Sequence, residues 1–171
     1  HIFRDNDIRG VAYKDLTEEV VIKLGKSLGS EALERGVKDF VIGRDGRLSS
    51  PDMYEWLSGG VLSTGCNVIN IGIVTSPMFY HSTFVLESAS GVVITGSHNP
   101  GEYNGFKVVF NNQSTSSEEI TSLKKRILNN DFKKGKGLCR DEDIQESYIN
   151  EIIRSVKLNK QLNISIDCGN G

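Results

Sequence analysis

The chain has little of several features that define common protein classes. Its three cysteines, Cys66, Cys139 and Cys168, are far apart and form no C-x-x-C pair. A disulfide framework or a zinc cluster is therefore not expected, and free thiols in a reducing cytoplasm are the better interpretation. No apolar run approaches the ~20 residues that span a bilayer, and the N-terminus lacks the basic start and apolar stretch of a signal peptide.

Charge of one sign is not in excess either. The chain has 20 Lys and Arg against 22 Asp and Glu, which gives a net charge of -2. This balance provides no bulk attraction to nucleic acid or to an anionic membrane, so neither is expected as a partner. Any anion-binding site must therefore be local.

Two widespread catalytic motifs are also missing. The segment Gly43-Arg44-Asp45-Gly46-Arg47 does not match the P-loop pattern G-x-x-x-x-G-K-[ST]. A hydrolase nucleophile elbow, G-x-S-x-G, is incomplete around Ser97 because Asn99 stands where the second glycine is required. His98 directly follows Ser97, and such neighbours usually point apart, which also disfavours an acyl-transfer site. We interpret the segment 43–47 as a turn held by an Arg-Asp network near the same sheet edge, and a direct contact of Arg44 or Arg47 with the substrate is the alternative.

Helical and strand patterns alternate along the 171 residues. Apolar residues at helical spacing predict helices near 16–35, 50–62, 75–86, 117–128 and 143–156. Short apolar runs predict strands near 39–42, 67–73, 91–95, 106–110 and 163–167, and glycines cluster where such runs end. This alternation favours an α/β sheet with helices on both faces. The strands at 91–95 and 106–110 are too close for a helical crossover, so they are expected to pair antiparallel.

These patterns predict an α/β fold, a three-layer α/β/α domain with a mixed four-stranded sheet, over about residues 1–142. A connecting helix and the first strand of a truncated second domain are expected over 143–171. The strand at 163–167 runs into a glycine-containing turn that normally leads into a helix, so we expect the chain to be a fragment of a longer protein. The basic stretch 131–140 is expected to be a surface loop.

The strongest local feature is the segment Thr95-Gly96-Ser97-His98-Asn99-Pro100. It follows a predicted buried strand, and ligands of open α/β sheets collect outside the carboxyl ends of strands. One interpretation is a polar turn whose side chains bond local backbone amides. The other is phosphoryl transfer, which needs cations and donors around a developing charge. His98, Lys107 and Arg9 could supply that charge, although Arg4 and Arg9 could equally pair with neighbouring aspartates at a surface turn.

Several segments together have a specific resemblance. The chain resembles the N-terminal domain of the α-D-phosphohexomutases, and within them the bacterial phosphomannomutase/phosphoglucomutase branch. The resemblance covers the whole chain and is carried, in this order, by Phe3-Arg4, Asp7-Ile8-Arg9-Gly10, Gly43-Arg44-Asp45-Gly46-Arg47, Thr95-Gly96-Ser97-His98-Asn99-Pro100, Tyr103-Asn104-Gly105-Phe106-Lys107 and Asp167-Cys168-Gly169-Asn170-Gly171.

The resemblance implies a phosphosugar mutase, an intramolecular phosphotransferase that interconverts hexose 1-phosphates and 6-phosphates. Ser97 matches the serine that carries the phosphate, which passes to the sugar to give a bisphosphorylated intermediate. Lys107 and Arg9 match residues beside it that stabilise charge and move protons, and His98 matches its neighbour. Asn6 stands where this branch commonly has a tyrosine that approaches the substrate, so Asn6, Arg9 and Lys107 are the expected substrate-binding residues.

The resemblance also implies Mg²⁺, bound through phosphorylated Ser97 and aspartates of the second domain. Those aspartates lie outside this chain, so the chain alone is expected to bind Mg²⁺ weakly and to be inactive. The alternative is a non-catalytic module that binds sugar phosphates and has lost the chemistry.

Overall fold

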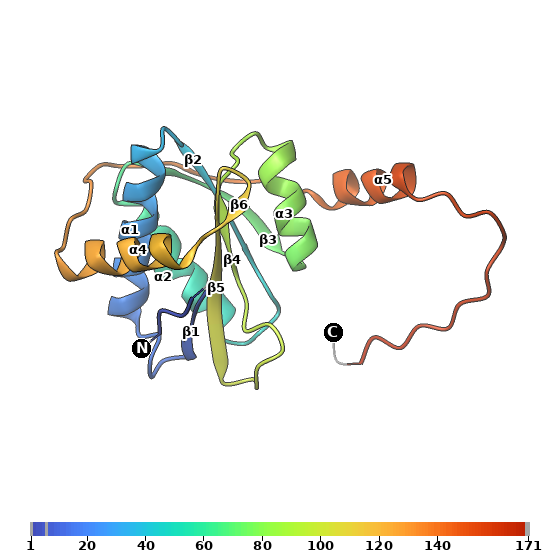
Figure 1. Cartoon of the computed structure of the whole chain (residues 1–171), viewed down its shortest axis with the longest axis horizontal. Coiled ribbons are helices and arrows are strands. Elements are labelled where there is room, and N and C mark those ends of the chain that lie inside the picture. Colours follow the sequence, from blue (N-terminus) through green and yellow to red (C-terminus); the bar gives the residue numbers. More distant parts are fainter. Residues whose placement is uncertain (1, 6, 170–171) are drawn as a thin grey trace.

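The computed structural model describes residues 2–5 and 7–169, and it arranges them as a sheet between two layers of helices (Figure 1). Helices α1, α2 and α4 cover one face of the sheet and α3 covers the other (Figure 1). This confirms the predicted three-layer α/β/α architecture. In chain order, the elements are β1 (Ile8–Val11), α1 (Glu18–Glu34), β2 (Asp39–Arg44), α2 (Ser50–Leu62), β3 (Asn67–Ile73), α3 (Ser76–Val85), β4 (Gly91–Ile94), β5 (Tyr103–Phe110), β6 (Gln113–Ser114), α4 (Ser117–Leu128), β7 (Cys139–Asp141) and α5 (Gln145–Ser155).

The sheet is mixed, as predicted, but within the described residues it has seven strands rather than four. The order is β1-β5-β4-β2-β3-β7, and β6 pairs with the far end of β5. Strand β2 pairs in parallel with β3 and β4, whereas β4 and β5 pair antiparallel, which confirms the expectation for those two strands. The strands that the sequence did not predict, β1, β6 and β7, have four residues or fewer. None of them is a continuous apolar run like the one that identified β4, which is no longer than β1, and they form because a longer strand offers them a free edge.

Local signals explain where most helices begin. The side chain of Thr17 caps α1 by accepting a hydrogen bond from the backbone N–H of Val20. Helix α4 begins with a capping box, in which Ser116 and Glu119 satisfy each other's backbone N–H groups. These caps use amides that the first turn of a helix leaves without partners.

Alternating strand residues build two cores. One side, under α1, α2 and α4, buries residues such as Ile42, Val92 and Phe106, and the other, under α3, buries Val41 and Val93. Because successive strand residues point to opposite faces, the register of each strand decides which side chains share a face with α3.

The C-terminal part departs from two expectations. Residues 131–138 form a loop, as expected, but Cys139–Asp141 pairs with β3 as strand β7. Helix α5 extends away from the sheet (Figure 1), and its Ile152 and Ile153 are exposed. No strand forms at 163–167, since a strand needs a hydrogen-bonding neighbour and these residues are exposed. The limits 1–142 and 143–171 stay a prediction.

Among residues 2–5 and 7–169, no helix has both the length and the apolar character that a membrane crossing requires.

Candidate active site

Ser97 lies on an exposed loop directly after β4, at the carboxyl end of that strand. Its φ angle is 55°, in the left-handed region, which costs a residue other than glycine roughly 1–3 kcal/mol. The backbone N–H of Ser97 donates to the side-chain oxygen of Thr95 at 2.9 Å, and the N–H of Asn99 donates to the carbonyl oxygen of Gly96 at 3.0 Å. The loop therefore presents the serine in a strained conformation that its surroundings must hold.

The guanidinium of Arg47 holds this loop through hydrogen bonds to its backbone carbonyl oxygens. Its Nη1 donates to the carbonyl oxygens of Pro100 at 2.7 Å and Tyr103 at 3.0 Å. Its Nη2 donates to the carbonyl oxygens of Ser97 at 3.1 Å and Asn99 at 2.7 Å. One side chain from the turn after β2 thus holds three carbonyl groups of the loop after β4 and that of Tyr103, the first residue of β5.

Asp45 holds Arg47 in turn, which confirms the predicted Arg-Asp network. One oxygen of its carboxylate lies 3.3 Å from Nε of Arg47 and accepts from the backbone N–H of Gly96 at 3.2 Å. The other oxygen accepts from the backbone N–H of Arg47 at 3.0 Å and from the hydroxyl of Ser50, the first residue of α2, at 2.6 Å. The buried amide of Asn104 donates to the same hydroxyl at 3.0 Å, so α2 and β5 are joined to this network.

The space around Gly96 shows how closely the network is packed. A Cβ atom added to Gly96 would lie 2.4 Å from Cζ of Arg47. Side-chain carbon atoms do not approach one another so closely, so a larger residue at this position would displace the guanidinium of Arg47.

Cationic groups approach the loop from β1 and β5. Arg9 on β1 donates from Nη1 to the side-chain oxygen of Asn99 at 3.1 Å, and its Nη2 pairs with Asp7 at 2.5 Å. Arg9 therefore satisfies both interpretations left open by the sequence, since it pairs with an aspartate and contacts the loop. Within the described part of the chain, the side chain of half-buried Lys107 on β5 forms no ion pair or hydrogen bond.

The strand register puts both cations on the side of the sheet that α3 covers. Arg9 is the register partner of Gly105, and Lys107 is the partner of Val93. Gly105 and Lys107 are two residues apart, so all four share a face, and Val93 belongs to the core under α3. The sequence-predicted cations therefore gather on one face beside the serine loop, and their charge favours an anion there.

His98 is exposed, and its Nδ1 lies 3.3 Å from Oγ of Ser97. The structure thus brings these two predicted residues into direct contact. Asn6, predicted to approach the substrate, lies outside the described residues.

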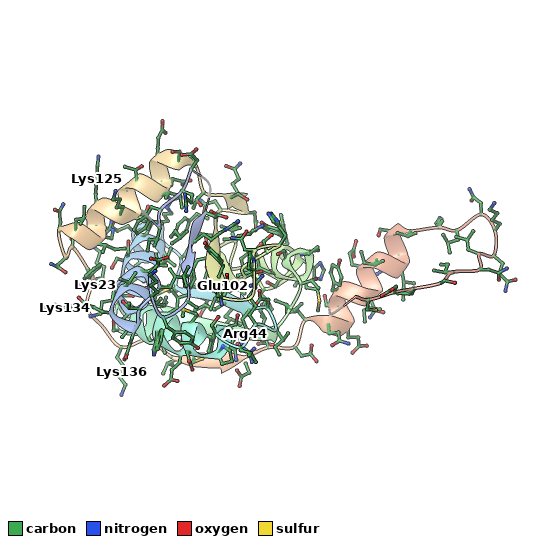
Figure 2. The ribbon with its side chains drawn as sticks, turned by 90° about the horizontal axis from the view of Figure 1, so that it is seen from below. Lys23, Arg44, Glu102, Lys125, Lys134 and Lys136 are labelled. Carbon is green, nitrogen blue, oxygen red and sulfur yellow. The ribbon has the colours of Figure 1, made fainter. Side chains whose placement is uncertain are left out.

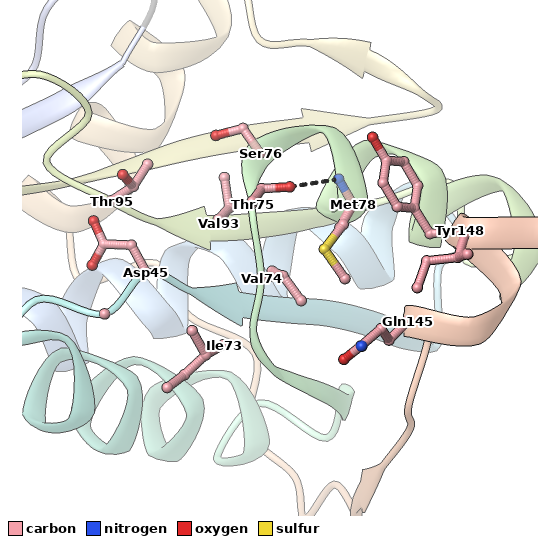
Figure 3. A pocket seen from close by; sticks show the side chains of 12 residues that line it. Asp45, Ile73, Val74, Thr75, Ser76, Met78, Val93, Thr95, Gln145 and Tyr148 are labelled. Carbon is pink, nitrogen blue, oxygen red and sulfur yellow. Dashed lines mark hydrogen bonds between the residues drawn. The ribbon is translucent and has the colours of Figure 1, made fainter. Parts of the chain in front are cut away.

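A cavity of about 530 Å³ opens beside the loop, on the same face of the sheet (Figure 3). Asp45 and Thr95 lie at one end of it, and Gln145 and Tyr148 from the region of α5 lie at the other. The first turn of α3 forms a further wall, where Thr75 accepts a hydrogen bond from the N–H of Met78 at 3.5 Å. Thr95, two residues before Ser97, therefore lines a space large enough for a small ligand.

The basic stretch near residue 135 lies away from this site. In Figure 2, Lys134 and Lys136 lie well apart from Arg44, at the carboxyl end of β2, and from Glu102. Its lysines are therefore not part of the cationic group around Ser97.

Comparison with known proteins agrees with this architecture. A family model described as phosphoglucomutase/phosphomannomutase, alpha/beta/alpha domain I, matches residues 1–134, which is more than half of the chain. The chain belongs to the phosphoglucomutase/phosphomannomutase family. The family assignment confirms the resemblance that the sequence motifs indicated.

Similar members of the phosphoglucomutase/phosphomannomutase family are longer than this chain. A protein named phosphomannomutase/phosphoglucomutase from Pseudomonas aeruginosa is 42% identical over 170 residues, which are 99% of this chain and 37% of that protein. A phosphoglucomutase from Neisseria meningitidis is 39% identical over 172 residues, again 99% and 37% of the two chains. The crystal structure of a family protein from Burkholderia thailandensis matches with a TM-score of 0.88 and 35% identity, covering 93% of this chain and 36% of that one. The chain spans little more than a third of these relatives.

The residues of this domain do not by themselves fit a Mg²⁺ site. Within residues 2–5 and 7–169, no group of three or more His, Cys, Asp or Glu side chains is placed to hold a metal ion. Asp45, the carboxylate next to the loop, already accepts hydrogen bonds from Gly96, Arg47 and Ser50. Since Mg²⁺ requires near-octahedral oxygen coordination, the described residues do not supply enough ligands for it.

The site residues that sequence reasoning missed are Arg47 as the anchor of the loop and Asn104 as its link to α2. Arg47 could be assigned only to a network near the same sheet edge, because its four acceptors lie 50 or more residues further along the chain. The signal that points to it is a second charged turn, Gly43 to Arg47, at the end of a neighbouring parallel strand.

Proposed function

We propose that the protein containing this chain is a phosphosugar mutase that interconverts hexose 1-phosphates and hexose 6-phosphates. Ser97 is the phosphate carrier, and Arg9, Lys107 and His98 are the groups that assist it. The observation that carries the proposal is the placement of Ser97. Ser97 is exposed, its backbone is held in a strained turn, and Arg9, which contacts this loop through Asn99, shares one face of the sheet with Lys107. The family assignment and the names of the relatives support the same class of reaction.

In the proposed reaction, a hydroxyl of the bound sugar monophosphate attacks the phosphorus of phosphoserine. The bond from Oγ of Ser97 to phosphorus breaks, a new sugar–phosphate bond forms, and the sugar hydroxyl loses its proton. The bisphosphorylated sugar then reorients, and its original phosphate returns to Oγ with the reverse proton transfer. The substrate leaves with its phosphate on the other carbon, and the enzyme is phosphorylated as before.

The cations have separate tasks in this proposal. Arg9 can hold phosphate oxygens in a bidentate manner, while it stays joined to the loop through Asn99. Lys107 supplies a point charge on the same face and moves the proton of the attacking hydroxyl. His98, 3.3 Å from Oγ of Ser97, assists at the serine itself. Mg²⁺ would neutralise phosphate charge when bound, through phosphorylated Ser97 and ligands outside this chain.

We further propose that the chain on its own is inactive, because it spans little more than a third of its relatives. Asn6 remains the proposed substrate contact of the N-terminal segment. All three cysteines are free thiols, which supports a reducing, cytoplasmic location.

The test uses the full-length protein. Incubation with a hexose bisphosphate should add one phosphate to the intact mass, and peptide mapping should place it on Ser97. The variant Ser97→Ala should take up no phosphate and should lose interconversion, with Ser122→Ala, at an exposed serine within α4, as the matched control. Substantial mutase activity in Ser97→Ala would refute the role of Ser97. Tight binding of hexose phosphate by the wild type without any transfer would favour the non-catalytic binding module.

A further inference from the structure

Arg47 uses every donor of its guanidinium within the serine loop and its support. A guanidinium has five N–H groups in a fixed planar fork. Nη1 and Nη2 donate to the four backbone carbonyls, at 2.7 to 3.1 Å, and Nε faces the carboxylate of Asp45 at 3.3 Å. Only 15% of the side chain is exposed. Arg47 therefore has no donor left for a substrate phosphate, unlike Arg9, which contacts the loop with Nη1 alone.

These contacts determine how Ser97 is presented. The peptide group before Ser97 is held by the side chain of Thr95, and the peptide group after it is held by Nη2 of Arg47. With both peptide groups fixed and φ at 55°, rotation about the Cα–Cβ bond is the only freedom left to the hydroxyl. Four backbone carbonyl oxygens accept hydrogen bonds from the guanidinium of Arg47, so the negative ends of these dipoles point at Arg47 rather than at an incoming phosphate.

We propose that Arg47 is a positioning residue for phosphoryl transfer. It holds the loop so that Oγ of Ser97 stands in line with the phosphorus, and it binds neither substrate nor product. Asp45 orients Arg47 for this task. The inference rests on the proposed function, because it assigns a role to Arg47 only if Ser97 carries the phosphate. A misplacement of about 1 Å at a reacting atom can reduce the rate about a hundredfold.

The test compares Arg47→Lys with Arg126→Lys in the full-length protein. Arg126 is a suitable control because its guanidinium is also largely buried, forms ion pairs with Glu31 and Glu34, and joins α1 to α4 on the other side of the sheet. Lysine keeps the charge at either position but cannot reproduce the fork. We expect kcat of Arg47→Lys to fall about tenfold to a hundredfold while KM for the hexose phosphate changes little. Arg126→Lys should lose a similar amount of thermal stability with kcat within about twofold of the wild type.

Two further measurements separate positioning from general damage. In Arg47→Ala, added guanidinium at sub-denaturing concentration should restore part of kcat, and it should have no such effect on Arg126→Ala. If the Arg47 variants cannot be purified, Asp45→Asn tests the same link, since it removes the charge that orients Nε but keeps an acceptor for Ser50. We expect a several-fold loss of kcat at unchanged KM in that variant.

The outcomes distinguish this inference from the proposed function. Full activity of Ser97→Ala would overturn the role of Ser97, and the role of Arg47 would fall with it. An inactive Ser97→Ala together with wild-type kcat in Arg47→Lys would overturn only the positioning role. A rise in KM at constant kcat in Arg47→Lys would also overturn it, because that result would make Arg47 a substrate ligand.

Discussion

Substitution of Gly96 by alanine tests the anchoring of the serine loop without touching a charged group. The added Cβ would lie 2.4 Å from Cζ, 2.5 Å from Nε and 2.8 Å from Nη1 of Arg47. All three distances are shorter than a Cβ atom tolerates, so the guanidinium must move by about 1 Å. Its bonds to the loop carbonyls, now 2.7 to 3.1 Å long, would then exceed hydrogen-bonding distance.

The size of the effect follows from those bonds. A hydrogen bond to a charged group contributes roughly 1.5–3 kcal/mol. Movement of Arg47 would break up to four such hydrogen bonds, but the loop is exposed, so bonds to water restore part of the lost stabilisation. We therefore expect Gly96→Ala to lower the free energy of unfolding by about 2–4 kcal/mol rather than by the full sum. Backbone conformation adds nothing to this loss, since the φ angle of Gly96 is not in the left-handed region.

Urea unfolding of the chain measures this loss, and the rate of Ser97 phosphorylation in the full-length protein measures its functional consequence. Gly101 provides the matched control, because it lies in the same loop and a Cβ added there has no neighbour within 4 Å. Gly101→Ala should change stability by less than about 0.5 kcal/mol. If Gly96→Ala proved as stable as Gly101→Ala, Arg47 would not be held in the observed position, and the reasoning would be refuted.

Three further predictions concern the rest of the fold. Gly60→Ala should lower the free energy of unfolding by about 1–3 kcal/mol, because its Cβ would lie 2.4 Å from a carbonyl oxygen of α1. Gly59→Ala, whose Cβ would have no neighbour within 4 Å, should raise it by about 0.5–1 kcal/mol. If urea unfolding showed that both variants change the free energy of unfolding in the same direction, the packing of α2 on α1 would be contradicted. Burial, helped by a nearby aspartate, raises the pKa of Cys66 to about 12, so a thiol reagent at pH 8 should label only the two exposed cysteines until the chain is unfolded. The hydrogen bond from Arg126 lowers the pKa of Glu34 below its ordinary value of 4.5, so the ion pair should stabilise the fold fully above pH 4.5 and lose its effect as the pH falls through the lowered pKa. Glu34→Gln should therefore reduce the loss of unfolding free energy at acid pH, and an unchanged loss would contradict the ion pair.

The local parts of this protein are determined by the sequence itself. The caps at Thr17 and Ser116 and the apolar spacing of the helices are decided by residues within a few positions of one another, so they could be predicted. The same holds for the apolar strands β2, β3, β4 and β5 and for the position of Ser97 after the end of β4. The antiparallel pairing of β4 and β5 follows from the short segment that joins them.

Tertiary structure alone decided how the site is assembled. Arg47 meets its acceptors, and Arg9 meets Asn99, because the order of the strands brings together residues 50 to 90 positions apart. The short strands β1 and β7 exist because longer neighbours offer them backbone hydrogen bonds. A pattern within the chain cannot specify such contacts, since their energy depends on which edges and faces meet once the sheet has formed.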